Sequence, residues 1–337
     1  MTPDPELTPP PKTSSLADAG LSLSAIGFGC ASLMRLPSAR ERRELIAATI
    51  DAGITHFDVA RMYGLGAAEA ELGRALRGRP ESVTIATKFG IDASGALQRL
   101  GRLQAPARAL LARSSKLRST VQARRDSFAT PRRYDADKAR ISLDRSLQEL
   151  GVGHVDILFL HDPRRHDEIE QAALVEFLDA ARRDGKIRAW GSSLDSVSDF
   201  EQMTNLPPAG VLQTRVDLLQ QEPPPGTSLV FGLMARHSLM SAWLRSHSDR
   251  RAEWSAALGA DPLVDDLLAK LLLAQAMALP GTPVALYATT KTARLEVAAT
   301  VLSAPPGPAL TEALSGLMAA DRDAILGAAQ ASGRFAP

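Results

Sequence analysis

The 337-residue sequence predicts an α/β fold, a closed (β/α)8 TIM barrel with long loops after strands 3 and 7. Two observations support this prediction. Short runs rich in β-branched residues are apolar at successive positions, as in strands that are buried on both faces. Helical patterns that stop at a glycine lie between most of these runs, which is typical of parallel βαβ units. Eight such units favour a closed barrel over an open doubly wound sheet.

The elements follow one another along the chain in a regular order. The expected strands are Ser24–Cys30, Thr55–Ala60, Val83–Phe89, His154–His161, Ile187–Ser193, Gly210–Val216, Ser228–Met234 and Val284–Thr289. The expected helices are Ala39–Ala52, Ala67–Leu76, Asp135–Leu150, Ile169–Asp184, Ser196–Met203, Pro262–Ala278 and Thr292–Leu302.

The domain organisation is expected to be simple. Residues 1–20 are Pro-rich and polar and are predicted to form a mobile tail, and residues 21–337 to form a single barrel domain. Residues 92–133 form a basic insertion with ten Lys and Arg against two Asp, a net charge of +8. Residues 236–259 interrupt the pattern a second time. Loops that follow barrel strands lie on the catalytic face, so both segments are candidate substrate covers. The basic insertion is either a site for an anionic substrate or partner, or a solvated loop.

The composition is that of a soluble globular protein, with 45% hydrophobic and 23% charged residues. A net charge of +1 gives no general signal for binding nucleic acid or a membrane, and no run of about 18 apolar residues predicts a transmembrane helix. Cys30 is the single cysteine, which excludes an intrachain disulfide and fits a cytoplasmic location. Neither CxxC nor HxxxH occurs, so we expect no metal site.

Four residues with useful chemistry lie at or just beyond the C-terminal ends of the second, third and fourth expected strands. They are Asp58, Tyr63, Lys88 and His161. Each has a structural interpretation when taken alone: a strand-end cap, a loop aromatic, a lysine that reaches solvent and a core histidine. Ionisable groups at buried strand ends are costly unless they pair, however, and parallel strands end on the same face. The combination therefore predicts one catalytic site.

The chemistry expected of these residues is proton transfer. A free tyrosine has a pKa near 10, and a nearby ammonium lowers it by favouring the phenolate. Lys88 can supply that ammonium, and Asp58 can orient it. A neutral His161 can donate a hydrogen bond to a substrate oxygen. The accompanying hydride would come from a cofactor, because no side chain supplies one.

Several segments resemble the aldo-keto reductase family. DAGITHFDVARMYGLGAAEAELGRAL is similar to the family signature D-x-G-…-F-D-x-A-x-x-Y-G-…-E-x-x-L-G, and TKFG, LGVGHVDILFLHDP and GKIRAWGSS match later blocks in order. The resemblance extends from about residue 23 to about residue 302. It implies a (β/α)8 barrel, NAD(P)(H) bound extended at the C-terminal ends of the strands, and Asp58, Tyr63, Lys88 and His161 as the catalytic tetrad.

The resemblance also implies cofactor contacts, with some departures from the family pattern. Ser193 and Gln213 match positions that bind the carboxamide, and Phe231 matches an aromatic that stacks on the nicotinamide. Thr289 and Arg294 match positions that bind the adenosine phosphate. The family's Asn after the serine is Leu194 here, its Glu-Asn pair is Val297-Ala298, and a frequent Lys is Ala288. Arg294 can bind a 2′-phosphate, which favours NADP(H) over NAD(H).

The predicted function is reversible hydride transfer between NADP(H) and a carbonyl compound (an aldehyde, ketone or sugar), with Tyr63 as general acid and base. The expected partner is thus a small-molecule carbonyl or alcohol. An alternative is a regulatory or sensor protein that binds the cofactor on the same barrel with little turnover. The departures at the cofactor positions leave this alternative open, while the four residues of the tetrad argue against it.

Overall fold

Eight parallel strands close into a barrel in this computed structural model, which describes residues 13–16, 20–93, 131–195, 203, 206–207, 210–219, 223–281 and 283–331. Around the barrel the order is β10-β3-β4-β5-β6-β7-β8-β9, so strands that follow one another in sequence are neighbours in space. Their bounds are β3 Ile26–Gly29, β4 His56–Asp58, β5 Thr84–Phe89, β6 Val155–His161, β7 Ile187–Leu194, β8 Val211–Arg215, β9 Thr227–Phe231 and β10 Val284–Tyr287. The predicted (β/α)8 barrel is confirmed.

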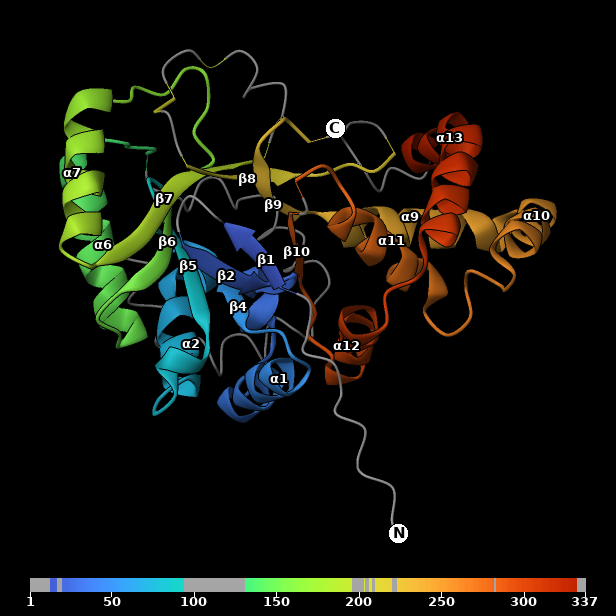
Figure 1. Ribbon diagram of the computed structural model, residues 1–337, viewed down its shortest axis with the longest axis horizontal. Coiled ribbons are helices and arrows are strands. Elements are labelled where there is room, and N and C mark those ends of the chain that lie inside the picture. The colour runs from blue at the N-terminus through green and yellow to red at the C-terminus, as the bar shows by residue number, and fades with distance from the viewer. Residues whose placement is uncertain are drawn as a thin grey trace, which may run out of the picture.

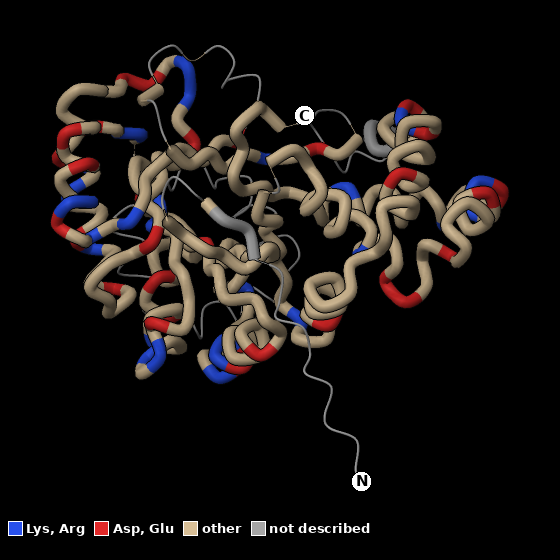
Figure 2. Tube along the Cα trace, viewed as in Figure 1, with Lys and Arg blue, Asp and Glu red and all other residues tan. Residues whose placement is uncertain are grey.

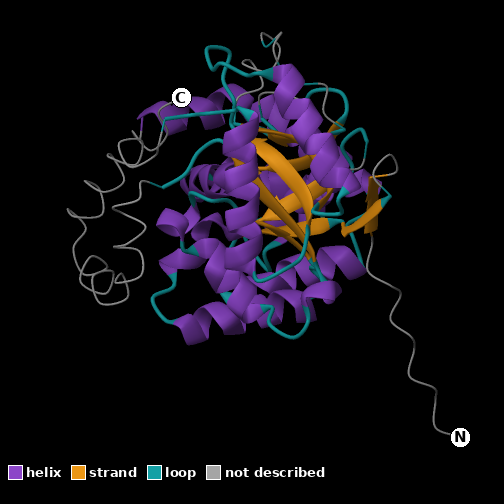
Figure 3. Ribbon diagram, turned by 90° about the vertical axis from the view of Figure 1, so that its left-hand side faces the viewer, coloured by secondary structure: helices purple, strands orange, loops and turns teal. Residues whose placement is uncertain are grey.

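Helices surround the strands on the outside of the barrel (Figure 3). Those at positions expected from sequence are α1 Ala39–Asp51, α2 Ala68–Ala75, α6 Ala136–Leu150, α7 Gln171–Arg183, α11 Leu267–Met277 and α12 Leu295–Ser303. Short 3-10 helices are η2 Cys30–Arg35, η3 Tyr63–Gly66, η4 Pro80–Ser82 and η6 Thr292–Arg294. Charged residues lie mainly on these outer helices, and the strands between them are largely uncharged (Figure 2).

Local signals set the helix ends. Ser38 and Glu41 form a capping box at the start of α1, which satisfies two backbone N–H groups that the helix leaves unpaired. Asp135 accepts a hydrogen bond from the Lys138 N–H at the start of α6. Gly151 ends the same helix with φ 69°, in the left-handed region that favours glycine.

Some segments differ from the sequence prediction. Residues 13–16, which we expected in the tail, form β1 (Thr13–Leu16), which pairs antiparallel with β2 (Leu21–Ser24). The seventh barrel strand ends at Phe231, earlier than expected, because Gly232 adopts φ 93° and α9 (Leu233–Ser246) begins after it. The segment expected as a long loop after this strand is mostly helical, in α9 and α10 (Ser248–Leu258). Most of the basic insertion, residues 94–130, and most of the helix expected at 196–203 lie outside the described residues.

The hydrophobic core has two main parts around the barrel wall. Inside the barrel, Leu21 and Leu23 of β2 pack with apolar side chains from the strands. Outside, the strands pack against the surrounding helices. A third cluster joins α9, α10, α11 and α13 (Pro308–Ala331) on the side of the molecule opposite α6 and α7 (Figure 1). Trp254, fully buried, lies in it and donates a hydrogen bond to Asp321. Among the described helices, none is long and apolar enough to cross a membrane.

Candidate active site

Strand alternation directs a set of mostly polar side chains into one end of the barrel. Side chains of a strand point alternately to its two faces. In β5, Ile85 and Phe89 face the outer core and Ala86 faces the barrel interior, so Lys88 also points inward. The same alternation directs inward-facing residues near the ends of the other strands into this end. They include Asp58 of β4, His161 of β6, Ser193 of β7, Gln213 of β8 and Phe231 of β9.

Asp58 and Lys88 form a buried ion pair at this end. The Lys88 Nζ atom donates to both carboxylate oxygens of Asp58, at 2.5 and 2.6 Å, and also lies 3.4 Å from the Val59 carbonyl oxygen. The side chains are 1% and 4% exposed. A buried charge is tolerated only when it is paired and hydrogen-bonded, and each of these two groups supplies the partner that the other requires.

Tyr63 lies beside this pair. The Lys88 Nζ atom is 5.2 Å from the centroid of the Tyr63 ring. Tyr63 is carried by the turn after β4, in which Gly64 and the non-glycine residue Leu65 both have positive φ, 60° and 59°. A Cβ on Gly64 would meet the Met34 side chain at 2.2 Å, so this position requires glycine.

His161 completes the group of four. Its ring lies edge-on to Tyr63, with centroids 5.8 Å apart and planes at 85°. Its backbone carbonyl accepts a hydrogen bond of 2.6 Å from the Tyr134 hydroxyl. Burial, with added repulsion from Lys88 and Arg132, lowers the pKa of His161 well below its ordinary value. The imidazole is therefore neutral at pH 7, and its buried Nδ1 has no hydrogen-bond partner among the described residues.

Ser193 and Gln213, predicted as carboxamide contacts, connect directly to the ion pair. The Ser193 hydroxyl donates to Gln213 Oε1, and Gln213 Nε2 donates to Asp58 Oδ2 at 2.8 Å. Ser193, Gln213, Asp58 and Lys88 thus form one buried hydrogen-bonded chain across the barrel mouth. Leu194, in place of the family's Asn, is buried in the next position.

The other predicted cofactor residues lie further along the same face. The Arg215 guanidinium carbon lies 5.5 Å from the centroid of the Phe231 ring, and Phe231 itself is half-buried. Thr289 follows β10, is buried, and exchanges hydrogen bonds with the backbone of Lys291. Arg294 is exposed in η6. The structure therefore brings Ser193 and Gln213 together with Asp58 and Lys88 of the tetrad.

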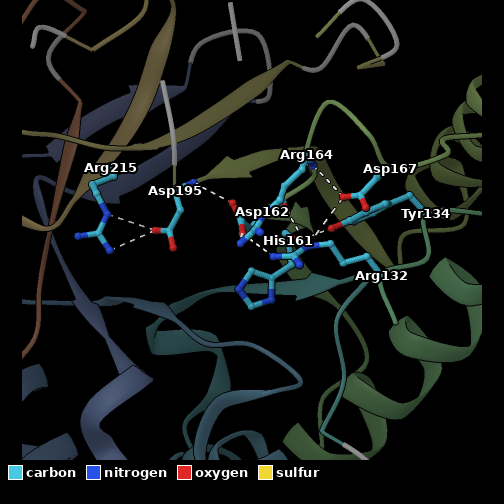
Figure 4. Close-up of polar contacts among 8 residues, drawn as sticks. All are labelled: Arg132, Tyr134, His161, Asp162, Arg164, Asp167, Asp195 and Arg215. Carbon is cyan, nitrogen blue, oxygen red and sulfur yellow. Dashed lines mark hydrogen bonds and ion pairs between the residues drawn. The ribbon is translucent and has the colours of Figure 1, made fainter. Parts of the chain in front are cut away.

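A network of charged side chains surrounds His161 at the rim of the barrel (Figure 4). Asp162, at φ 49°, accepts hydrogen bonds from Arg132 at 2.8 Å and from the Asp195 backbone N–H at 3.2 Å. Asp195 in turn pairs with Arg215 at 3.3 Å. Burial, with repulsion from Asp195, raises the pKa of Asp162.

These rim residues were not predicted as part of the site. Asp162 lies in the segment LGVGHVDILFLHDP, which resembles the family, and nothing in the sequence relates Arg132 to Asp162, thirty residues away. The one sequence signal for this part of the site is that Asp162 directly follows His161 at the end of a predicted strand. Asp is among the residues that tolerate positive φ in a tight turn.

The site combines a buried cation, an adjacent phenol and a neutral imidazole. A cation beside a phenol favours its ionised form, and a neutral imidazole can donate a hydrogen bond to an oxygen between the two rings. Such a set can move a proton to or from a substrate oxygen.

Comparisons with known proteins show which family and which fold the chain resembles. The sequence model of the "Aldo/keto reductase family" matches residues 25–231. The chain is 32% identical to a D-threo-aldose 1-dehydrogenase from Pseudomonas sp over 52% of this chain and 51% of that protein. It is 34% identical to a pyridoxal 4-dehydrogenase from Microbacterium luteolum over 44% of this chain and 42% of that protein. The matches thus span about half the length of these relatives or less.

Solved structures show the same fold. An aldo-keto reductase from Bacillus halodurans in its holo form has a TM-score of 0.66 at 19% identity, covering 91% of this chain and 96% of that one. A glycerol dehydrogenase from Gluconobacter oxydans has a TM-score of 0.66 at 18% identity, covering 91% and 95%. At this level of identity the likeness concerns the fold alone.

Proposed function

The chain belongs to the aldo/keto reductase family, and we propose that it interconverts a carbonyl compound and its alcohol, with NADP(H) as cofactor and Tyr63 as general acid and base. The observation that carries this proposal is the position of Lys88. Its ammonium is paired with Asp58 and lies 5.2 Å from the Tyr63 ring centroid, in a site closed to solvent around the pair. A phenol so placed is the acid for reduction and, as phenolate, the base for oxidation.

The residues present fit a nicotinamide cofactor. When bound, the cofactor supplies or accepts the hydride. Ser193, Gln213 and Phe231 would contact the nicotinamide end, since they project into the barrel mouth beside the tetrad. Thr289 and Arg294 would contact the adenosine end, and the exposed guanidinium of Arg294 suits a 2′-phosphate. This last residue is the basis for proposing NADP(H) over NAD(H).

The roles of the tetrad follow from its contacts. Asp58 fixes the Lys88 ammonium through two hydrogen bonds. Lys88 stabilises the phenolate of Tyr63, and Tyr63 exchanges a proton with the substrate oxygen. Because His161 is neutral, it donates one hydrogen bond to that oxygen and directs it toward Tyr63.

We propose a sugar or other polar aldehyde as the substrate class. Relatives named D-threo-aldose 1-dehydrogenase and 6-dehydroglucose reductase act on sugars by name. The charged rim of Arg132, Asp162, Asp195 and Arg215 offers hydrogen bonds to hydroxyl groups near His161.

The test is binding followed by turnover. The purified protein is titrated with NADPH and NADH by nucleotide fluorescence, and then mixed with a panel of aldoses and simple aldehydes. We expect tighter binding of NADPH and oxidation of bound NADPH by at least one aldehyde. Cofactor binding without oxidation by any member, and without reduction of NADP+ by the matching alcohols, would instead support the sensor alternative. Failure to bind either nucleotide would reject both.

A further inference from the structure

Glu69 connects the two chain segments that carry Tyr63 and Lys88. Its Oε1 accepts a hydrogen bond of 2.7 Å from the Thr87 hydroxyl, and its Oε2 accepts one of 2.6 Å from Arg61. Thr87 directly precedes Lys88 in β5, and Arg61 lies two residues before Tyr63 in the turn after β4. We call Glu69, Arg61 and Thr87 the Glu69 bridge.

The bridge is sealed from solvent. The side chains of Arg61 and Glu69 are 3% and 1% exposed, and Thr87 is fully buried. Strand alternation explains the arrangement, since Lys88 points into the barrel and Thr87 points outward to α2, where Glu69 stands in the first turn. A carboxylate that is almost fully buried depends on these two donors, so its position fixes theirs.

Arg61 of the Glu69 bridge also lies near a second carboxylate, that of Asp92. The Arg61 Nε atom lies 3.7 Å from Asp92 Oδ1, and Asp92 Oδ2 accepts a hydrogen bond of 2.5 Å from Lys138 of α6. Ion pairs thus connect the turn that carries Tyr63 to Glu69 of α2 and, through Asp92, to Lys138 of α6.

The turn has a conformation that needs such support. Leu65 has φ 59°, a left-handed conformation that costs energy for a residue with a side chain. Strained backbone persists only where surrounding contacts over-determine it. Arg61 supplies contacts of this kind at the start of the turn.

We propose that Glu69 is a positioning residue: through Arg61 and Thr87 it sets the separation between the Tyr63 phenol and the Lys88 ammonium. The inference rests on the proposed function for its catalytic consequence. The separation itself is a property of the folded protein and can be measured without turnover.

A second carboxylate on the same helix provides a matched control. Glu71 is also buried and also paired, with Arg42 of α1 at 2.6 Å and with Arg74 of α2. Its partners lie outside the turn with Tyr63 and outside β5. Replacing Glu71 therefore removes a comparable buried charge pair without touching the Glu69 bridge.

The experiment compares Thr87→Val, Thr87→Ser, Glu69→Gln and Glu71→Gln with the unmodified protein. For each we would measure the titration of the Tyr63 phenol by NMR of ¹³Cζ-labelled tyrosine, the pH profile and value of kcat, and KM for NADPH. Thr87→Val removes the hydroxyl at nearly constant volume and no charge, so it is the variant least disposed to unfold. We expect it to move the phenol titration toward the ordinary value near 10 and to lower kcat about tenfold to a hundredfold, as misplacement of catalytic groups does. KM for NADPH should not change.

The conservative variant and the control decide the interpretation. Thr87→Ser keeps a hydroxyl and should restore both readouts, and Glu71→Gln should lower the unfolding midpoint but leave the phenol titration in place. The inference is overturned if Thr87→Val keeps the original phenol titration, or if Glu71→Gln shifts it as far as Glu69→Gln does. If the unmodified protein reduces no carbonyl, the proposed function fails, while the NMR titration still tests the bridge.

Discussion

The Lys88 ammonium faces two partners at once: it is paired with Asp58 at 2.5 Å and lies 5.2 Å from the centroid of the Tyr63 ring. The ion pair with Asp58 allows the ammonium to be buried, and the contact with Tyr63 places its positive charge beside the phenol ring. Because little water screens charges there, the effect of the ammonium on Tyr63 is stronger than at a surface.

Tyr63→Phe should preserve the fold and abolish most turnover. The ring keeps its packing against Lys88 and His161, and only the proton-bearing oxygen is lost. General acid and base catalysis contributes about 10²–10⁴-fold, so kcat should fall by that amount while NADPH still binds. Steady-state kinetics and nucleotide fluorescence on the same preparation measure both. A variant with near-original kcat would remove Tyr63 from the mechanism.

His161 should act as a neutral donor across the working pH range. Burial lowers its pKa well below the ordinary value, so the imidazole does not titrate near pH 6.5, where a free histidine does. The pH profile of kcat should therefore have no inflection from His161 near pH 6.5. His161→Gln should lower kcat about a hundredfold, the usual cost of one lost donor to a reacting oxygen. If the pH profile of kcat has an acid limb that disappears in His161→Gln, the imidazole takes up a proton in the working pH range and the prediction is wrong.

His56 should make the fold less stable in acid. It is fully buried below Asp58, bonded to the Thr84 hydroxyl at 2.9 Å, and burial lowers its pKa from 6.5 to about 4. Between these two values the unfolded chain binds a proton that the folded chain does not, so the free energy of unfolding falls as pH falls, by up to about 1.4 kcal/mol per pH unit. Urea unfolding at several pH values measures the slope.

The matched comparison for this prediction uses two histidine variants. His56→Gln should make the slope between pH 6.5 and 4 shallower, whereas His166→Gln, at an exposed position, should not alter it. If the dependence of the unfolding free energy on pH is unchanged in His56→Gln, His56 binds its proton as readily in the folded protein as in the unfolded chain.

Cys30 should be unreactive in the native protein. It is fully buried, and burial, with repulsion from Asp58, raises the pKa of its thiol far above the ordinary value. The thiolate is the reactive form, so iodoacetamide should label Cys30 only after unfolding. Mass spectrometry with and without urea measures the extent of labelling, which can only be at Cys30 because it is the single cysteine of the chain. Rapid native labelling would show that η2 opens readily.

Much of the fold follows from short-range patterns. The eight strands were predicted because both alternations of each run are apolar, and Asp58, Lys88 and His161 were grouped because parallel strands end on one face. α9 and α10 were missed because their residues pack in a separate cluster with α13 and carry a mixed pattern of His, Arg and Ser. The alternation of strands and helices in a (β/α)8 barrel does not predict extra helices such as α9 and α10.

Contacts between residues that are distant in sequence could not be predicted from the sequence alone. The contact between Gln213 and Asp58 spans 155 positions, and sequence assigned Gln213 only by resemblance. Glu69 illustrates the same limit: it belongs to the E-x-x-L-G segment of the signature, but its contacts with Arg61 and Thr87 depend on how α2 packs on β5. Packing of that kind follows from tertiary structure, as with Gly73, where a Cβ would meet the Leu150 backbone at 2.3 Å.

The acidity of the Tyr63 phenol is the most direct measure of the central claim. The chain has three tyrosines, and burial raises the pKa of both Tyr134 and Tyr287, so ¹³Cζ-tyrosine NMR can resolve all three titrations. We predict that one signal, absent in Tyr63→Phe, titrates below the ordinary value near 10 and that the other two titrate above it. A Tyr63 signal that titrates at or above 10 would contradict the account, because the neighbouring ammonium would then not be acidifying the phenol.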